Sequence, residues 1–187
     1  LDMFLNTNVT SKEDAQIATG DGTGQNLTGL VTSAPAYTAA AAGITDANIK
    51  DLVRKMRTAI VKNRGSKYSP NFVAANSEVI DQYILKKDGN NNYMFDAATG
   101  TIGGLLIVED NNLADNTLVV GDSRFGTIYE KGGVVLSKVY AGDQAIEDMM
   151  TLKARKRLLF LIRNVDKTGF LKCTDIDAAL ATLATAP

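Results

Sequence analysis

Apolar residues recur at helical spacing in several stretches of the chain. After Thr45 and Asp46, which suit a helix start, an apolar stripe alternates with charged positions and predicts a helix that packs on one side only. The stripe consists of Ile49, Leu52, Val53, Met56 and Ile60. We expect further helices at 11–18, after a cap at Asn76 or Ser77, and at 175–184.

Short apolar runs bounded by turn signals predict strands. These runs occupy 71–75, 102–109, 117–120, 134–140 and 170–173. Residues 151–163 (TLKARKRLLFLIR) fit either an amphipathic helix or a long edge strand with basic residues on its exposed positions. Helices and strands are mixed without regular βαβ repetition, which predicts the α+β class.

Composition indicates an ordinary globular chain with one well-formed core. Of its 187 residues, 45% are hydrophobic and 22% are charged. The formal net charge of -1 provides no global attraction for nucleic acid or an anionic membrane. The longest strongly apolar run, at 158–162, is far shorter than the ~20 residues that span a bilayer. No membrane partner is therefore expected.

The chain contains no histidine and a single cysteine, Cys173. Catalytic relays that use histidine are therefore impossible, and so are zinc sites that need histidine or several thiolates. Only carboxylate or lysine chemistry remains, and no apolar pocket is recognisable beside a carboxylate pair. We expect no catalysis, no cofactor, no metal and no small-molecule substrate.

A glycine-rich stretch raises the question of phosphate binding. Four glycines at Gly20, Gly22, Gly24 and Gly29 invite a nucleotide-binding interpretation. The known fingerprints, however, need a buried strand before the glycines and a helix directly after them, and a Walker loop also needs a Gly-Lys pair, which this stretch lacks. A structural turn is the favoured interpretation, and a small phosphate-binding α/β protein is the alternative.

The densest basic segment also has two interpretations. It contains Lys153, Arg155, Lys156 and Arg157, with Arg163 nearby. A DNA-binding module would use such a segment. Without interleaved aromatic residues or net positive charge, a solvated or subunit-facing surface is favoured, so these five residues are the candidate subunit-contact surface.

Several segments, taken in their order along the chain, resemble a known family. The glycine-rich GDGTGQNLTGL at 20–30 is followed by NSEVIDQYILKKDGNNNYMF at 76–95 and IGGLLIV at 102–108. VVGDSRFGTIYEKGG at 119–133 and the basic and apolar segment up to Arg163 come next. This order and approximate spacing resemble the C-terminal part of tailed-phage major capsid proteins of the Hong Kong 97 type.

The resemblance implies a fold and a division of the chain. It implies a Hong Kong 97-type α+β fold, in which a mixed sheet with flanking helices forms the A domain. Residues 1–19 would be the end of the spine helix in a partial P domain, 20–140 an A-domain-like lobe, and 141–187 a return to the P domain. The glycine turn would then be the corner into the A domain, and 151–163 a long strand. Upstream elements of the family would lie before Leu1.

The resemblance also implies a function. The chain would be a structural subunit, the major capsid protein of a phage or prophage, that self-assembles into an icosahedral shell enclosing DNA. Its partners would be copies of itself in pentamers and hexamers, with weak and non-specific contact to packaged DNA. It would reside in the virion, and in the host cytoplasm before assembly. Some relatives form a Lys–Asn cross-link promoted by a Glu, but the corresponding positions hold Asp148 and Arg155, so no cross-link is expected.

Overall fold

A five-stranded mixed sheet forms the centre of the larger part of the molecule, which we call the lobe. The computed structural model describes residues 2–64, 67–87, 90–93, 100–140 and 142–186. The strand order is β2-β3-β1-β4-β9, with β1 parallel to β3 and the other neighbouring pairs antiparallel. The strands are β1 (Phe72–Ala75), β2 (Thr101–Ile102), β3 (Leu105–Glu109), β4 (Leu118–Gly121) and β9 (Phe170–Cys173).

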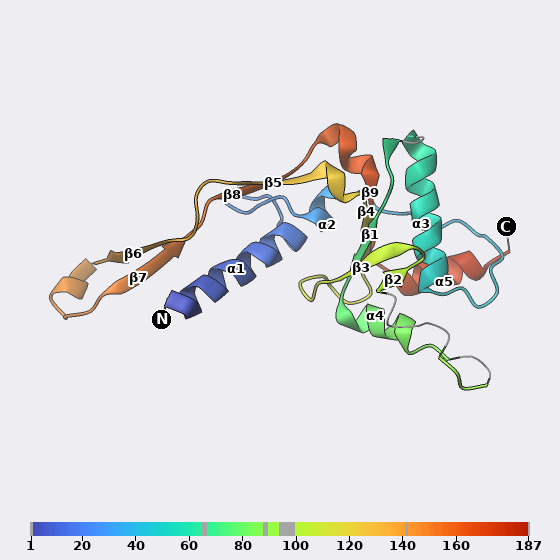
Figure 1. The fold of residues 1–187 in the computed structure, drawn as a ribbon, viewed down its shortest axis with the longest axis horizontal. Helices are drawn as coiled ribbons and strands as arrows, with labels where there is room; N and C mark the ends of the chain where they lie inside the picture. The colour runs from blue at the N-terminus through green and yellow to red at the C-terminus, as the bar shows by residue number, and fades with distance from the viewer. Residues whose placement is uncertain (1, 65–66, 88–89, 94–99, 141, 187) are drawn as a thin grey trace.

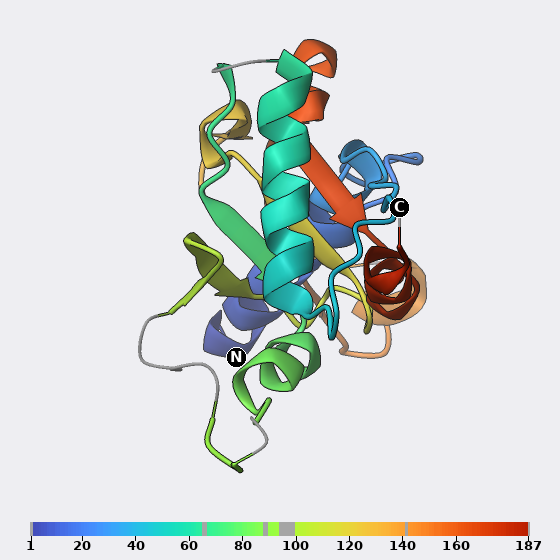
Figure 2. The same ribbon diagram turned by 90° about the vertical axis from the view of Figure 1, so that its right-hand side faces the viewer.

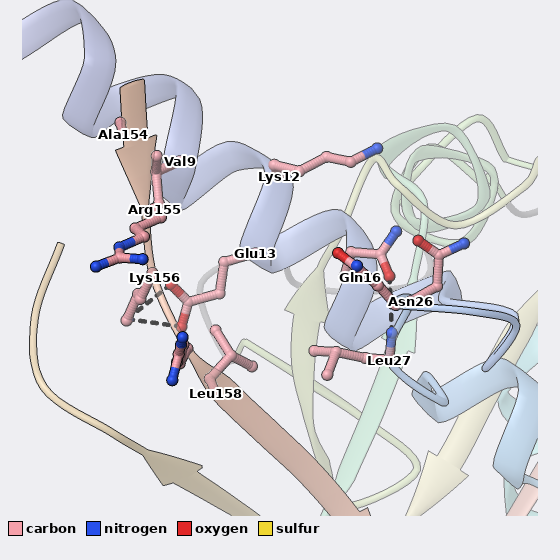
Figure 3. A pocket seen from close by; sticks show the side chains of 12 residues that line it. Val9, Lys12, Glu13, Gln16, Asn26, Leu27, Ala154, Arg155, Lys156 and Leu158 are labelled. Atoms are coloured by element: carbon pink, nitrogen blue, oxygen red, sulfur yellow. Dashed lines mark hydrogen bonds and ion pairs between the residues drawn. The ribbon is translucent and has the colours of Figure 1, made fainter. Parts of the chain in front are cut away.

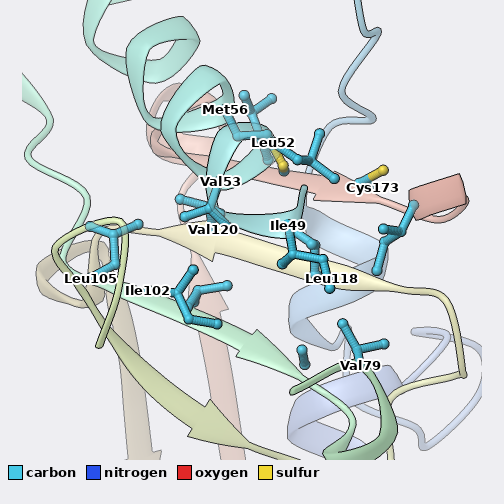
Figure 4. Packing of buried hydrophobic residues seen from close by; sticks show 14 of the residues in the cluster. Ile49, Leu52, Val53, Met56, Val79, Ile102, Leu105, Leu118, Val120 and Cys173 are labelled. Atoms are coloured by element: carbon cyan, nitrogen blue, oxygen red, sulfur yellow. The ribbon is translucent and has the colours of Figure 1, made fainter. Parts of the chain in front are cut away.

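Three helices share one apolar core with this sheet: α3 (Ile49–Arg64), α4 (Ser77–Ile84) and α5 (Ile176–Ala184). The long helix α3 lies across the strands, with α4 below it and α5 beside it (Figure 2). Its predicted stripe points inward: Leu52, Val53, Met56 and Ile60 are fully buried. Figure 4 shows this stripe packed against strand residues such as Leu118 and Val120. The helical repeat in the sequence therefore predicted the buried face of α3 correctly.

Side-chain caps begin two of these helices. The Asn76 side chain accepts a hydrogen bond from the Glu78 N–H at 3.0 Å, so the predicted cap of α4 is confirmed. The Asp175 carboxylate accepts one from the Ala178 N–H at 3.0 Å at the start of α5. Each cap satisfies an N–H group that has no partner inside the helix.

The N-terminal helices adjoin the rest of the core. Helix α1 (Asp2–Thr19) buries Ala18 in a small cluster with Ala74 of β1 and Leu113. The short helix α2 (Leu30–Ser33) lies beside a second cluster that includes Val119 and Phe170. The last turn of α1 is thereby fixed to the lobe, while most of its length lies along the arm described next (Figure 1).

Two antiparallel ribbons extend from the lobe as an arm (Figure 1). The inner ribbon pairs β5 (Gly126–Glu130) with β8 (Leu158–Ile162), and the outer ribbon pairs β6 (Val135–Val139) with β7 (Thr151–Arg155). The 3-10 turn η4 (Gly142–Ala145) lies at the tip. Two further turns, η3 (Ser123–Phe125) and η5 (Asn164–Gly169), connect the arm to β4 and β9.

The structure corrects several sequence-based predictions. The helix expected at 11–18 already begins at Asp2; its first turns are mostly exposed, so no apolar spacing marks them. The single strand expected at 102–109 is a hairpin, because Gly103 and Gly104 adopt φ values of 60° and 82° and turn the chain. The helical alternative for 151–163 is wrong: this segment forms β7 and β8, interrupted at residues 156–157.

The predicted division at residue 140 does not coincide with a change in packing. Strand β9 and helix α5 come from 141–187, yet Cys173 and Leu183 belong to the core of the lobe. Strands β5 and β6 come from 20–140, yet they leave the lobe and pair with β8 and β7. The arm is therefore built from both ranges, and the assignment of ranges to named domains stays a prediction.

Candidate functional site

An open groove lies where α1 runs past the arm (Figure 3). Its volume is about 550 Å³, and its walls come from α1, from residues 25–27 of the glycine turn and from residues 154–158 of the arm. Polar side chains of α1, among them Lys12, Glu13 and Gln16, line one wall. The groove is thus the junction at which a helix, a turn and a ribbon far apart in sequence meet.

Lys156 holds this junction together. Its ammonium group lies 2.7 Å from a carboxylate oxygen of Glu13 on α1 and 3.2 Å from one of Glu130 on β5. The hydrogen bond from Lys156 to Glu13 raises the pKa of the lysine, with Glu130 contributing as well. Both Lys156 and Glu13 have largely covered side chains, with 16% and 12% exposed. Lys156 therefore faces inward, although the sequence grouped it with outward-facing cations.

The remaining members of the predicted contact surface separate in space. Lys153, Arg155 and Arg157 are exposed along the arm. Arg163 lies at the base of the arm, where its guanidinium contacts Asp166 at 2.7 Å. Four of the five cations are therefore exposed, although Arg163 is paired locally with Asp166, and only Lys156 is largely covered. Their role in subunit contact stays a prediction.

The four predicted glycines lie in one closed turn between α1 and α2. Three of their N–H groups donate within the chain: Gly20 to the Gln16 carbonyl, Gly22 to that of Leu27, and Gly29 to that of Gly20, at 2.8–3.0 Å. The turn follows the C-terminal end of α1, where the helix dipole disfavours an anion. These contacts favour a corner over a phosphate cradle.

An aspartate inside the turn reinforces it. The Asp21 carboxylate accepts hydrogen bonds from the Thr23 hydroxyl at 2.6 Å, the Thr23 N–H at 3.0 Å and the Asn26 side-chain amide at 2.9 Å. These bonds, that of the Thr23 hydroxyl first, lower the pKa of Asp21 to about 2. Gly22, at φ 75°, provides the left-handed conformation that this geometry requires.

A buried carboxylate fixes the base of the arm. Asp166 in η5 is fully buried, and Lys67, directly before the core residue Tyr68, contacts it at 2.6 Å. The Tyr68 hydroxyl lies 3.1 Å from the same carboxylate, and Arg163 contacts its other oxygen. The hydrogen bond from Lys67 lowers the pKa of Asp166 most, with Tyr68 and Arg163 adding to the effect. The negative charge is thus held between two cations.

A second buried carboxylate, Asp122, fixes the other strand connection. It accepts hydrogen bonds from the Ser69 N–H at 2.8 Å, from the Arg124 N–H at 3.2 Å and from the Arg124 guanidinium. Burial by itself would raise the pKa of Asp122, but these hydrogen bonds outweigh it and the pKa is lowered. The two connections between lobe and arm, one through η3 and one through η5, therefore both contact residues 67–69.

Sequence reasoning missed both buried aspartates. Neither residue was assigned a role from the sequence, because neither Asp122 nor Asp166 stands in a motif that indicates burial. Their partners at 67–69 are far away in sequence, and no local pattern marks the pairing. The dense charge around Arg163 was the only available signal, and it was assigned to an outer surface.

The arm exposes many large apolar side chains. Tyr129 and Leu159 on the inner ribbon are 56% and 50% exposed, and Ile146 at the tip is 85% exposed. Others are Ile128, Val135, Leu136, Val139, Tyr140, Met149, Met150 and Leu161. Each ribbon has only two strands, so each strand also has an unpaired backbone edge. Exposed apolar surface of this extent marks an interaction site.

The described part of the chain contains neither a membrane-spanning helix nor a cluster of metal-binding side chains. Among the described residues, no helix is long and apolar enough to cross a bilayer. In the same part of the chain, no three side chains of metal-binding type come together.

Comparison with known proteins places the fold. The model of the phage capsid family matches residues 1–169. A chain in the capsid of an empty GTA particle superposes with a TM-score of 0.66 at 17% identity, over 92% of this chain and 65% of that chain. A chain from Mycobacterium phage Adephagia superposes with a TM-score of 0.65 at 14% identity, over 91% of this chain and 62% of that chain. A chain from Gordonia phage Cozz superposes with a TM-score of 0.65 at 10% identity, over 89% of this chain and 60% of that chain.

The chain thus spans less than two thirds of the length of these solved chains. A search of curated proteins found no match. The structural likeness confirms the predicted Hong Kong 97-type α+β fold. Because the family model covers nearly the whole sequence and the fold agrees with it, the chain belongs to the phage capsid family.

Proposed function

We propose that the protein is a major capsid subunit that assembles with copies of itself into an icosahedral shell enclosing DNA. The observation that carries this proposal is the arm, which exposes large apolar side chains along both ribbons. Membership of the phage capsid family supports a second copy as the partner that covers this surface. The GTA chain with the same fold comes from a capsid computed with C5 symmetry, which supports an arrangement around symmetry axes.

The arm is suited to contacts that repeat many times. Burying one large apolar side chain contributes roughly 1.5–3 kcal/mol before the entropic cost of association is subtracted. Individual contacts therefore stay weak enough to be reversible, so that a misplaced subunit can leave, while the sum over a closed shell is large. The buried aspartates at the base of the arm hold the two strand connections to the lobe, so that the arm presents its surface in a defined direction.

The same proposal assigns a role to each part of the chain. Residues 1–19 act as the end of the spine helix, 20–140 supply most of the A-domain lobe, and 141–187 return through the P domain before β9 and α5 complete the core of the lobe. Helix α1 lies along the arm, with Lys156 joining the two. The exposed cations Lys153 and Arg155 belong to the proposed subunit-contact surface, and contact with packaged DNA is weak and non-specific. The subunit performs no catalysis; it resides in the virion, and in the host cytoplasm before assembly.

Assembly of the full-length gene product, with its upstream region included, tests the proposal. We expect rings or shells by negative-stain microscopy and fast-sedimenting species by analytical ultracentrifugation. The double variant Leu159→Asp/Leu161→Asp places charge on exposed arm positions and should leave the protein folded but monomeric. Val165→Asp changes a residue of η5 that is more exposed than either leucine and lies outside the arm strands, and it serves as the control. A wild-type product that stays monomeric under all assembly conditions would overturn the proposal.

A further inference from the structure

The solvent-facing side of α3 carries a concentrated positive charge. Arg54, Lys55 and Lys62 are exposed, and Arg57 is half-buried at the edge of the exposed side. The acidic residue on the same helix is Asp51, which bonds to the Asn48 N–H. Within the described part of the chain none of these four cations forms an ion pair.

Two of these cations, Arg54 and Arg57, contact the β2–β3 turn. The Arg54 guanidinium donates to the Gly103 carbonyl at 3.2 Å, and Arg57 lies beside the β2–β3 turn at Gly104. Lys55 and Lys62 are seven positions apart, two helical turns, and so lie on one side of the exposed face. The face is open to solvent at the front of the lobe (Figure 2).

A negatively charged surface occupies the end of the lobe where β1 and β3 finish. Glu78 and Asp81 are exposed on α4, opposite its buried residues. Glu109 pairs in register with Ala75, directly before α4, and is exposed as well. Asp115 accepts a hydrogen bond from Asn76 at 3.0 Å and lies at the same end. We call Glu78, Asp81, Glu109 and Asp115 the acidic end.

The two charged surfaces do not neutralise each other within one copy. Among the residues that the structure places, no ion pair joins Arg54, Lys55, Arg57 or Lys62 to the acidic end. Yet the chain as a whole has a formal charge of only -1. When two copies meet, two cationic faces or two acidic faces repel each other, whereas a cationic face attracts an acidic one. This favours a head-to-tail contact between copies.

We infer that the cationic face of α3 docks against the acidic end of the lobe in a neighbouring copy of this chain. The inference rests on the proposed function, because it assigns the partner surfaces of one capsid contact. A contact between two different faces of the same lobe repeats around an axis and closes into a ring when the rotation allows it. DNA would engage the α3 cations alone and would leave the acidic end without a role, so a second copy fits both surfaces.

The contact has a defined salt dependence. Exposed ion pairs are individually weak, and their attraction is largely screened when the Debye length falls from about 10 Å at 0.1 M salt to about 3 Å at 1 M. Assembly of the full-length product should therefore require more protein as salt increases. Apolar contacts of the arm should instead become stronger in salts that favour burial of apolar surface, such as sulfate.

Charge reversal on each surface, alone and combined, tests the inference in the full-length product. Lys55→Glu/Lys62→Glu or Glu78→Lys/Asp81→Lys should each raise the protein concentration for half-maximal assembly about tenfold at 0.1 M salt. The chain with all four changes has complementary faces again and should assemble nearly as the wild type does. Lys55→Arg/Lys62→Arg keeps the charge and is the matched control. Circular dichroism and thermal unfolding of each variant separate loss of contact from loss of fold.

Zero-length cross-linking identifies the contact directly. Assembled mixtures of isotope-labelled and unlabelled protein, treated with a water-soluble carbodiimide, should give mixed-isotope links from Lys55 or Lys62 to Glu78, Asp81 or Glu109. The inference is overturned when wild-type protein assembles but the reversals change nothing, when the combined variant fails to recover, or when α3 reversal reduces only retained DNA. Failure of the wild type to assemble refutes the proposed function, and with it this contact.

Discussion

At the residue scale, two buried carboxylates connect the lobe to the arm. Asp122 and Asp166 lie on the two strand connections, and both contact the short segment 67–69 that follows α3. A buried carboxylate without partners is very unfavourable, so each of these residues requires its hydrogen-bonding neighbours in place. The direction of the arm and the position of the end of α3 are therefore coupled.

This coupling makes stability depend on pH through Asp166. Its pKa in the folded chain lies below the ordinary value, chiefly because of the hydrogen bond from Lys67. Its contribution is therefore fully present above an unfolded-state pKa of about 3.9 and is lost as the pH falls through the folded-state pKa. Asp166→Asn should be less stable than wild type in urea at pH 7, and the difference should shrink below about pH 4. Asp14→Asn, an exposed change on α1, should show no such difference.

Lys156 is predicted to hold α1 against the arm. Lys156→Met keeps the aliphatic length but leaves Glu13 and Glu130 without their cation. Since pairing raises the pKa of Lys156, the link should persist through neutral pH and weaken only as the pH rises through that raised value. Hydrogen exchange measured by mass spectrometry should become several-fold faster in α1. Lys153→Met removes an exposed charge nearby and should leave α1 unchanged; equal exchange in all three proteins would contradict the predicted link.

At the element scale, the turn between α1 and α2 depends on close backbone approach. A Cβ atom at Gly20 would lie 2.5 Å from the Gln16 carbonyl oxygen and against the Leu27 carbonyl. Gly133 has open space around it and no left-handed φ. The turn therefore requires glycine for geometric reasons at position 20, whereas the arm tolerates a side chain at 133.

We predict that Gly20→Ala destabilises the protein by roughly 1–3 kcal/mol, because the backbone must shift to relieve these contacts. Gly133→Ala should change the free energy of unfolding by less than about 0.5 kcal/mol. Urea denaturation followed by circular dichroism measures both. Calorimetric titration with ATP should give no binding heat, since three of the four glycine N–H groups already have partners. Measurable heat that disappears in Gly20→Ala would restore the phosphate-binding alternative.

At the scale of the whole molecule, the lobe and the arm differ in how they are stabilised. The lobe has a continuous core in which Leu118 and Val120 of β4 are fully buried. The arm consists of two-stranded ribbons whose strands have free edges and exposed apolar faces. A two-stranded ribbon without a covered face is only marginally stable by itself. The arm is therefore expected to acquire much of its stability from the neighbours it contacts.

Hydrogen exchange before and after assembly checks this expectation. Amide groups in 126–139 and 151–162 should exchange rapidly in the monomer and become at least about tenfold slower in the assembled product, because opening there requires little free energy until a partner covers the ribbons. The lobe strands β1 and β4 should be protected in both states and provide the internal control. An arm that is already as protected as β4 in the monomer would contradict this view.

Sequence patterns predicted helices that bury one face and expose the other. The buried stripe of α3 and the cap of α4 were correct, because periodicity and capping are local properties. The early start of α1 and strand β5 went unpredicted, whereas the equally exposed β6 was predicted because its residues form an apolar run. The turn inside 102–109 was visible as two glycines, but apolar neighbours on both sides made the segment look like one strand.

The sequence by itself determined which chemistry is unavailable, since a chain without histidine and with one cysteine has few catalytic or metal-binding options. The order of its segments also determined the family. Only the tertiary structure decided which charges face outward. Lys156 meets Glu13 across 143 positions and Lys67 meets Asp166 across 99. Such pairings arise from the packing of whole elements, whereas a sequence pattern reports only on the element that contains it.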